Sequence, residues 1–224
     1  NAVMLSTIHD YLAGILTNTT PVTHSSDGAS LGLFDLKNLC FDENALSAVG
    51  INKAFLPKVI STTSVAGKTD CDFLPHGIPV AVAIGDNQAS FLGSVAEPEK
   101  SVLVNVGTGS QVSFATKNCT TPPCGEIRPL TDRDYLFVGS SLCGGRAYAI
   151  LKSFFSMCAD MLGGSHDNLY EKMDALSENI FNIEDELTVN CEFCGSRENP
   201  SKRGSIENIG IDNFTPEKLI CGEL

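Results

Sequence analysis

Two short polar turns carry the residues whose types and spacing could perform chemistry. Gly85-Asp86-Asn87-Gln88 places a carboxylate directly after an apolar run, and Gly107-Thr108-Gly109-Ser110 offers backbone N–H groups and two hydroxyls after another. N–H groups in glycine turns bind phosphate, and a positioned carboxylate can accept a proton from an alcohol. Phosphoryl transfer to an alcohol requires both features. Each turn alone is also typical of an ordinary strand connection, so these residues by themselves indicate only a two-domain α/β protein with a candidate phosphate site.

The elements predicted around these turns would bring them to the ends of strands. Residues 78–84 form a continuous apolar run rich in β-branched residues, which predicts a strand buried on both faces, and a helix begins near Ala89. Residues 101–106 and 111–115 flank the second glycine turn as a hairpin. Gly144-Gly145 opens an amphipathic helix that extends to Leu162, and its apolar face is expected to pack in the core.

The rest of the chain is predicted to form shorter elements and loops. The break in the pattern at Val95–Lys100, which combines charge and proline, indicates a domain boundary. The expected elements are a helix over 5–16, a short helix from Asp42 to Val49 ended by Gly50, a strand over 135–138, a helix over about 167–177 and a final helix capped by Thr215 before Pro216, with loops over 19–30, 61–77 and 117–134.

Composition and charge exclude several classes of protein. The 224 residues carry 15 Lys and Arg against 27 Asp and Glu, which gives a formal net charge of −12 and a pI near 4.6. No basic run could bind nucleic acid, and an acidic membrane surface would repel the chain. The longest apolar run is far below the ~18 residues of a membrane span. The sequence starts at Asn1, next to a helix, and ends about two helical turns after Pro216, so we expect an internal part of a longer protein.

The nine cysteines, an odd number, favour structural or redox-inert thiols over a disulfide framework. Cys191-x-x-Cys194 and Cys119-x4-Cys124 are the close pairs. No second C-x-x-C or His pair follows at the spacing that a four-ligand zinc site needs. We therefore expect a cytoplasmic protein that uses none of its own residues as a metal site, while a zinc-binding interaction module stays open as an alternative.

Several stretches, in order along the chain, resemble the FGGY family of carbohydrate kinases. Residues Gly77–Gly93 are similar to the family's G-I-P-V…D-x-Q-A…G stretch, and Asn105–Ser110 is similar to its second phosphate motif with G-T-G. Ser6–Leu12 resembles the helix before the substrate-domain loop, and Asp27–Ser30 with Leu33–Asp35 resembles the segment after it. Leu56-Pro57 matches the L-P that precedes the G-I-P strand.

The resemblance implies a fold of two actin-like ATPase (ribonuclease H-like) domains flanking a cleft. Residues 1–96 would be the C-terminal part of the first, sugar-binding domain, and residues 97–224 the N-terminal part of the second, nucleotide-binding domain. The implied activity is transfer of the ATP γ-phosphoryl group to a hydroxyl of a ketose, with ATP and Mg²⁺ as cofactors. The small-molecule sugar and ATP are the only partners expected, and the oligomeric state stays open.

The resemblance also assigns roles to single residues. Asp86 would be the catalytic base and would contact the substrate, and Asn87 would contact the sugar hydroxyls. Four residues on the nucleotide side follow in the same way: Thr108 would contact nucleotide phosphate within the Gly107-Thr108-Gly109 turn, and Gly145 would lie beside the nucleotide. At Ala149 some relatives carry a polar residue that contacts the nucleotide, and this chain lacks it.

The acceptor sugar expected from the resemblance is sedoheptulose, with sedoheptulose 7-phosphate as the product. The stretches Gly195–Pro200 and Arg203–Ile209 resemble members of the family that use this substrate. Xylulose, ribulose and glycerol are the alternative acceptors within the family. A non-catalytic actin-like binding or regulatory protein is the alternative outside catalysis, although the presence of Asp86 argues against it.

Overall fold

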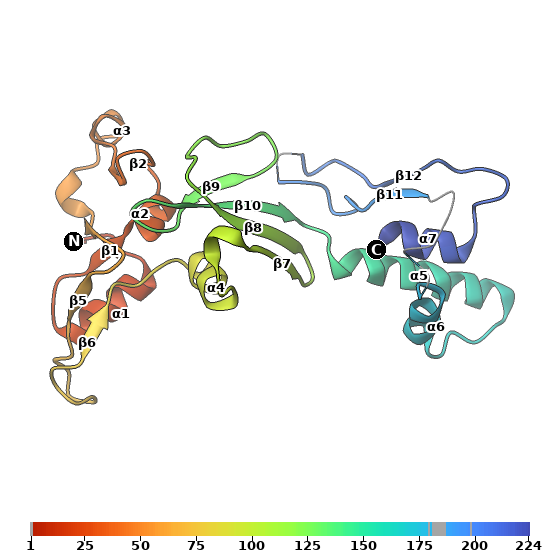
Figure 1. Cartoon of the computed structure of the whole chain (residues 1–224), viewed down its shortest axis with the longest axis horizontal. Coiled ribbons are helices and arrows are strands. Elements are labelled where there is room, and N and C mark those ends of the chain that lie inside the picture. The colour runs from red at the N-terminus through yellow and green to blue at the C-terminus, as the bar shows by residue number, and fades with distance from the viewer. Residues whose placement is uncertain (1, 179, 181–186, 198) are drawn as a thin grey trace. The chain divides into compact units, whose positions relative to one another are not determined.

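The structure is a computed structural model that describes residues 2–178, 180, 187–197 and 199–224 (Figure 1). Asn1 and Glu198, which belong to stretches discussed above, lie outside these residues. The chain divides into two compact units. Unit 1 comprises Asn1–Leu103 and Val112–Gly139, and unit 2 comprises Val104–Gln111 and Ser140–Leu224.

Unit 1 mixes short helices with short strands. In chain order it contains α1 (Ile8–Thr17), β1 (Val22–His24), α2 (Ser25–Leu31), β2 (Phe34–Asp35), β3 (Cys40–Phe41), α3 (Glu43–Ala48), the 3-10 helix η1 (Lys53–Phe55), β4 (Lys58–Ile60), β5 (Val65–Lys68), β6 (Pro79–Ala81), α4 (Asp86–Ser94), the 3-10 helix η2 (Pro98–Lys100) and β9 (Glu126–Pro129).

Three strands are divided between the units, and unit 2 adds mainly helices. The shared strands are β7 (Val102–Val106), β8 (Ser110–Thr116) and β10 (Tyr135–Ser141), and unit 2 continues with α5 (Gly145–Leu162), α6 (Leu169–Leu176), β11 (Thr188–Asn190), β12 (Ser205–Glu207) and α7 (Pro216–Glu223).

The largest sheet has four strands in the order β7-β8-β10-β9, with β9 and β10 antiparallel. Each of the other described sheets has two strands. β1 pairs in parallel with β4, while β2–β3, β5–β6 and β11–β12 pair antiparallel. The α/β character predicted from the sequence is therefore confirmed.

Side-chain caps explain where three of the helices begin. The Thr7 hydroxyl accepts the Asp10 N–H at the start of α1, and the Asp42 carboxylate accepts two N–H groups at the start of α3. Thr215 caps α7 in the same way, with proline next to it. Gly50, with φ of +72°, follows α3 in the left-handed conformation that glycine adopts without strain. The predicted signals at Asp42, Gly50 and Thr215 are confirmed, whereas α1 begins at Ile8 and not at the predicted residue 5.

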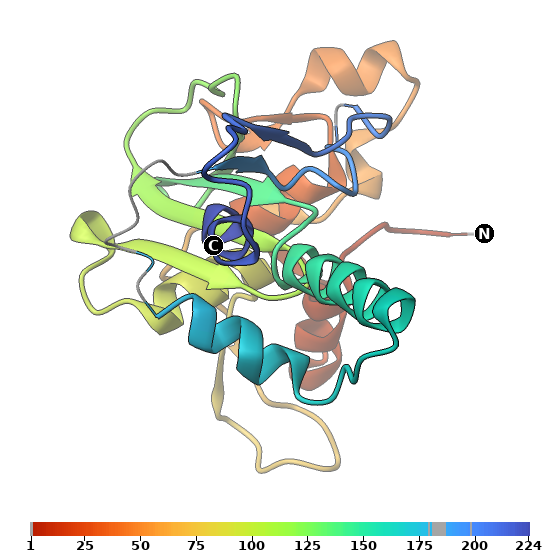
Figure 2. The same cartoon turned by 90° about the vertical axis from the view of Figure 1, so that its right-hand side faces the viewer.

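Each unit has its own hydrophobic core. In unit 1, Phe91 of α4 is fully buried against sheet residues, and the cluster comprises Phe91, Leu130, Leu136 and Val138. In unit 2, α5, α6 and α7 lie against one another (Figure 2) around a cluster of Leu151, Met173, Leu187, Leu219 and Ile220.

Three predicted loops contain regular structure, so these predictions are wrong in part. The segment 19–30 contains β1 and most of α2, the segment 61–77 contains β5, and the segment 117–134 contains β9. Each of the three strands is only three or four residues long. Polar or proline-containing strands of that length leave no alternating apolar pattern in the sequence.

Two predictions about burial are also wrong. β6 pairs with β5 alone in a two-stranded sheet, and 47% of Ile78 is exposed, so the run 78–84 is not buried on both faces. Along α5 only Ala147 and Leu151 are buried, while Phe154 and Met161 of the predicted apolar face are exposed. An apolar stripe marks a face able to pack, but not how much of it a neighbouring element covers.

No helix among the described residues is both long and apolar enough to cross a membrane.

Candidate active site

Asp86 is the first residue of α4 and follows Gly85, which lies four residues after the end of strand β6 at Ala81. The side chain is exposed, and its Oδ1 accepts the Asn87 N–H at 2.7 Å. A carboxylate at a helix N-terminus is favoured by the positive end of the helix dipole. Two positions further along, Gln88 is buried and its Nε2 donates to the Pro129 carbonyl at 2.9 Å, which anchors this turn of the helix.

A chain of buried hydrogen bonds holds the turn that presents Asp86. The Gly85 N–H donates to Ser26 Oγ at 2.9 Å, and Ser26 Oγ lies 2.8 Å from His24 Nδ1. His24 Nε2 lies 2.9 Å from Thr62 Oγ1, which in turn donates to Asp132 at 3.1 Å. Burial lowers the pKa of His24, against the opposing charges of Asp132 and others. The imidazole is therefore neutral near pH 7 and acts as a hydrogen-bonding link.

Gly85 is required at its position by lack of space. A Cβ there would lie 2.5 Å from Gln88 Oε1 and 3.6 Å from Asp27 Oδ1. The second contact shows that the carboxylate of Asp27 lies beside the turn that precedes Asp86.

Asp27 is a buried carboxylate that the sequence did not single out as a site residue. Its Oδ1 lies 2.7 Å from His9 Nε2, and its other oxygen has no hydrogen-bond partner among the described residues. Burial raises its pKa, the hydrogen bond to His9 opposes this, and the charges of Asp10 and Asp86 add to the increase. Both carboxylate oxygens of Asp10 also lack a partner in the described part of the chain. Unit 1 thus carries a buried acidic pair beside the Asp86 turn.

In unit 2, the turn Gly107-Thr108-Gly109 packs directly against the start of α5. The N–H groups of Gly144 and Gly145 donate to the carbonyls of Thr108 and Gly107 at 2.9 and 2.8 Å. A Cβ on Gly109 would lie 2.7 Å from the Ser141 carbonyl, so the backbones approach closely at this point. The structure therefore brings together all four residues predicted on the nucleotide side.

This turn lines a pocket of about 440 Å³ that lies wholly within unit 2. Thr108 is exposed, and its hydroxyl makes no hydrogen bond within the described residues. Arg146, the second residue of the 18-residue helix α5, and Arg197 contribute two positive charges, and none of the described residues that line the pocket is acidic. The lining residues are Asn105, Gly107, Thr108, Gly109, Ser110, Gln111, Ser140, Ser141, Leu142, Arg146 and Arg197.

The chemistry of this pocket fits an anion such as a phosphate group. Hydroxyl donors and two guanidinium groups are groups that bind phosphate in proteins, whereas the N–H groups of Gly107, Gly144 and Gly145 are already bonded to carbonyls and shape the turn. The glycine turn was predicted from the sequence, but Ser141, Arg146 and Arg197 were not. They come from segments far away along the chain, and no local motif marks them. Gly145 contributes through its backbone, because a Cβ there would lie 3.2 Å from the Gly107 carbonyl.

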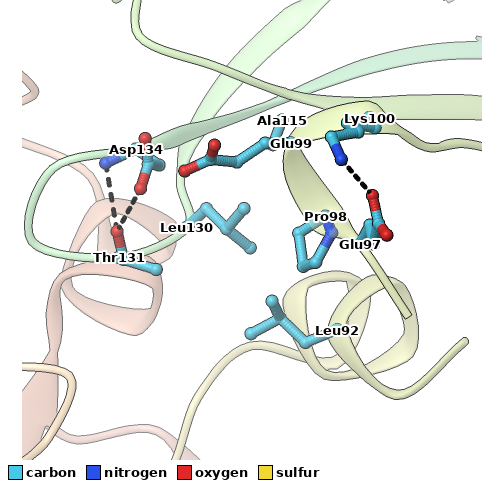
Figure 3. Close-up of a pocket in the computed structure, with 9 residues that line it drawn as sticks. All are labelled: Leu92, Glu97, Pro98, Glu99, Lys100, Ala115, Leu130, Thr131 and Asp134. Carbon is cyan, nitrogen blue, oxygen red and sulfur yellow. Dashed lines mark hydrogen bonds and ion pairs between the residues drawn. The ribbon is translucent and has the colours of Figure 1, made fainter. Parts of the chain in front are cut away.

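A second pocket, of about 470 Å³ in unit 1, contains none of the predicted site residues (Figure 3). Leu92, Ala115 and Leu130 form an apolar wall. The one basic residue of its lining, Lys100, is paired with Glu97 at 2.7 Å, Asp134 is paired with Lys117 at 2.6 Å, and the remaining charged residue, Glu99, is acidic. This pocket therefore offers no comparable anion-binding group.

Among the described residues, no group of three or more His, Cys, Asp or Glu side chains is arranged to hold a metal ion. The zinc-binding alternative thus finds no supporting arrangement in that part of the chain.

Solved structures share this fold over nearly the whole chain. Xylulose kinase from Rhodospirillum rubrum aligns with a TM-score of 0.78 and 18% identity, covering 99% of this chain and 45% of that one. Plasmodium falciparum glycerol kinase with ADP aligns with a TM-score of 0.71 and 19% identity, covering 98% of this chain and 44% of that one. The fold is accordingly that of the actin-like ATPases, as predicted.

Sequence relatives indicate the family. Residues 1–93 match the N-terminal domain of the FGGY family of carbohydrate kinases. The sedoheptulokinase of Homo sapiens is 28% identical over 93% of this chain, and Enterococcus faecalis glycerol kinase is 32% identical over 68% of it. These matches relate the chain to the FGGY family of carbohydrate kinases, with the family model itself matching residues 1–93. The chain spans 46% of the length of the human relative and 29% of the bacterial one.

Proposed function

We propose that this chain is part of an ATP-dependent kinase that phosphorylates a ketose sugar. The observation that carries the proposal is the pocket built on the Gly107-Thr108-Gly109 turn in a chain related to the FGGY family. Two arginines and three hydroxyl-bearing residues besides Thr108 surround the turn, which suits the phosphates of a nucleotide. A chain that had kept only the fold would have no need for this set of anion-binding groups.

The two units would contribute different halves of the reaction. We assign sugar binding to residues 1–96 and nucleotide binding to residues 97–224. Asp86 would accept the proton of the attacking hydroxyl, and Asn87 beside it would bind hydroxyls of the sugar. The exposure of Asp86 supports this role, because it leaves the carboxylate accessible to a hydroxyl of the substrate.

Thr108, Gly107, Gly109 and Gly145 would hold the phosphates of ATP. The Thr108 hydroxyl is available to donate a hydrogen bond, and Arg146 would neutralise phosphate charge. When bound, ATP with Mg²⁺ supplies the phosphoryl group and part of the charge neutralisation. The protein residues orient the phosphates and hold the charge at the pocket, and positioning of this kind accounts for most catalysis of phosphoryl transfer.

Sedoheptulose is the acceptor that we propose, and sedoheptulose 7-phosphate is the product. Similarity to the human sedoheptulokinase extends over 93% of the chain, whereas similarity to the E. faecalis glycerol kinase extends over 68%. Glycerol, xylulose and ribulose are the competing acceptors. We further propose a cytoplasmic location, in keeping with nine cysteines that form no disulfide bond.

The test is product formation by the full-length protein with ATP and a panel of sedoheptulose, xylulose, ribulose and glycerol. We expect the highest kcat/KM with sedoheptulose. A preference for glycerol or xylulose would refute the proposal that sedoheptulose is the acceptor, but it would still support the proposed kinase activity. No phosphorylation of any panel member, together with intact ATP binding, would favour a non-catalytic actin-like protein.

The role of Asp86 is tested in the same assay with Asp86→Asn. We expect kcat to fall by ~10²–10⁴-fold with little change in KM for the sugar, because general-base catalysis contributes about that much. Asp72→Asn is the matched control, since Asp72 is an exposed carboxylate of unit 1 outside the site. If kcat of Asp86→Asn stayed within a few-fold of the wild type, Asp86 would be only a turn residue.

A further inference from the structure

Two cysteines from distant parts of the sequence meet beside the phosphate pocket. Cys143 lies between β10 and α5, and Cys194 lies in the turn after β11. Their sulfur atoms are 3.8 Å apart. A disulfide bond is ~2.05 Å long, so the two sulfurs need to approach by only roughly 1.8 Å to bond.

The two thiols have opposite environments. Arg146 Nη1 donates to Cys194 Sγ at 3.8 Å, and this hydrogen bond, with a second one from Cys143, lowers the pKa of the Cys194 thiol. Cys143 is buried, with 5% of its surface exposed, and burial raises its pKa. Thiolates next to arginine are the reactive form of cysteine, whereas a buried thiol stays protonated. Cys194 is therefore the nucleophile of the pair and Cys143 the resolving thiol.

The neighbour in the C-x-x-C motif is not the partner of Cys194. The Cys191 thiol contacts the carbonyl oxygens of Val189 and Glu223, each at 3.8 Å, and burial raises its pKa. The sequence suggests a Cys191–Cys194 pair, but the geometry joins Cys194 to Cys143 instead.

We propose that Cys194 and Cys143 form a reversible redox-modification site that reacts with hydroperoxides. The Cys194 thiolate attacks a peroxide oxygen, so that an S–O bond forms, the O–O bond breaks and hydroxide leaves. Cys143 then attacks the resulting sulfenic sulfur, an S–S bond forms, and the hydroxyl departs as water with the Cys143 proton. In total two thiols are oxidised to one disulfide and one hydrogen peroxide is reduced to two waters. A dithiol reductant reverses the change.

The disulfide would act directly on the phosphate pocket. Cys143 precedes Gly144, whose N–H bonds the glycine turn, and the Cys143 N–H donates to Ser141 Oγ in the pocket lining at 3.2 Å. Joining Cys143 to Cys194 displaces this segment where the backbones have no spare room. We expect weaker binding of a nucleotide phosphate by the oxidised protein. This second consequence rests on the proposed function, whereas disulfide formation itself does not.

The experiment treats the reduced full-length protein with limiting hydrogen peroxide, blocks free thiols with N-ethylmaleimide and maps the linked peptides by mass spectrometry. We expect a peptide pair joining Cys143 to Cys194 that disappears after dithiothreitol. In the Cys143→Ser variant, dimedone should trap a sulfenic acid on Cys194. Cys191→Ser is the matched control and should leave the 143–194 link unchanged.

The role of the guanidinium is tested by the rate of alkylation of Cys194 at fixed pH. Arg146→Gln should slow it severalfold, and Arg146→Lys should retain most of the rate because it keeps the positive charge. A link from Cys191 to Cys194, no link at all, or dimedone labelling of the exposed Cys124 before Cys194 would each overturn the proposal. The linked-peptide map of the wild type decides the first two points even if a variant fails to fold, and the dimedone comparison is made in Cys143→Ser, where no thiol removes the sulfenic acid.

Discussion

Replacing Gly144 by alanine probes the contact on which the phosphate pocket depends. The added Cβ would lie 2.8 Å from the Gly109 carbonyl carbon and 2.9 Å from the Gly107 oxygen, and it would also press on Ser110 Oγ. Two of these three atoms belong to the backbone and cannot rotate away. The glycine turn and the start of α5 must therefore move apart.

The size of the effect follows from what that movement breaks. It removes or stretches the hydrogen bonds from Gly144 N–H to Thr108 and from Gly145 N–H to Gly107, each contributing ~0.5–1.5 kcal/mol. Overpacking destabilises the folded state by a further ~1–3 kcal/mol. The lower conformational entropy of the unfolded chain with alanine stabilises the folded state by ~0.4–1 kcal/mol. The net loss is about 3 kcal/mol, which lowers Tm by roughly 6–12 °C at ~2–4 °C per kcal/mol.

Calorimetry of the wild type and the variant measures the change in Tm directly, and nucleotide titration measures the loss of affinity at the pocket. Gly164→Ala is the matched control, because its Cβ would meet only the Ala159 carbonyl at an ordinary 3.7 Å. We expect the control to melt within a degree or two of the wild type. Equal Tm values for the two variants would show that the turn and the helix do not pack as described.

Three further predictions concern the two sides of the site and the pH dependence of folding. Thr108→Val should weaken the use of ATP by roughly 10–100-fold with little effect on binding of the sugar, because one hydrogen bond to a charged group contributes ~1.5–3 kcal/mol. Thr120→Val, at an exposed position, is the control in nucleotide titrations. If the two variants bound the nucleotide with equal affinity, Thr108 would not belong to the site. Ser26→Ala should lower kcat more than it raises KM, because the Gly85 N–H loses its acceptor; an unchanged kcat would show that the Asp86 turn is held without it. Burial raises the pKa of Glu223 to about 7 from an ordinary 4.5, so the folded state binds the proton more tightly and stability falls as pH rises from about 4.5 through about 7. Glu223→Gln should therefore raise Tm more at pH 8 than at pH 5, whereas a pH-independent difference like that of the exposed Glu217→Gln would contradict the assigned burial.

Local signals in the sequence were sufficient to predict an element's end where a single side chain determines that boundary. Asp42 and Gly50 delimit α3, Thr215 begins α7, and Gly144-Gly145 opens α5. These signals act within one helical turn, so they can be recognised without knowing the rest of the fold. The degree of burial of β6 and α5 could not be predicted in this way, since it depends on which distant segments cover them.

The site shows the same division. The glycine turn and Asp86 are recognisable because the chemistry is local to a strand end. Asp27 and its neighbours lie in a polar stretch that predicts a loop, yet Thr23, His24 and Asp27 are buried and ordered by hydrogen bonds. Polar burial leaves no hydrophobic period, and only the three-dimensional pairing of β1 with β4 brings these side chains inside.

The buried hydrogen-bond chain in unit 1 gives this polar burial a reason. The proposed base Asp86 follows a short two-stranded sheet that cannot position it alone, because among the described residues β6 pairs on one edge only, with β5. Ser26 fixes the Gly85 N–H, and His24 holds Ser26 in place from the other side. Because burial keeps His24 neutral, the link carries no charge that would compete with Asp86 for a proton. The polar stretch after α1 therefore holds the turn that precedes Asp86, although it does not contact the carboxylate itself.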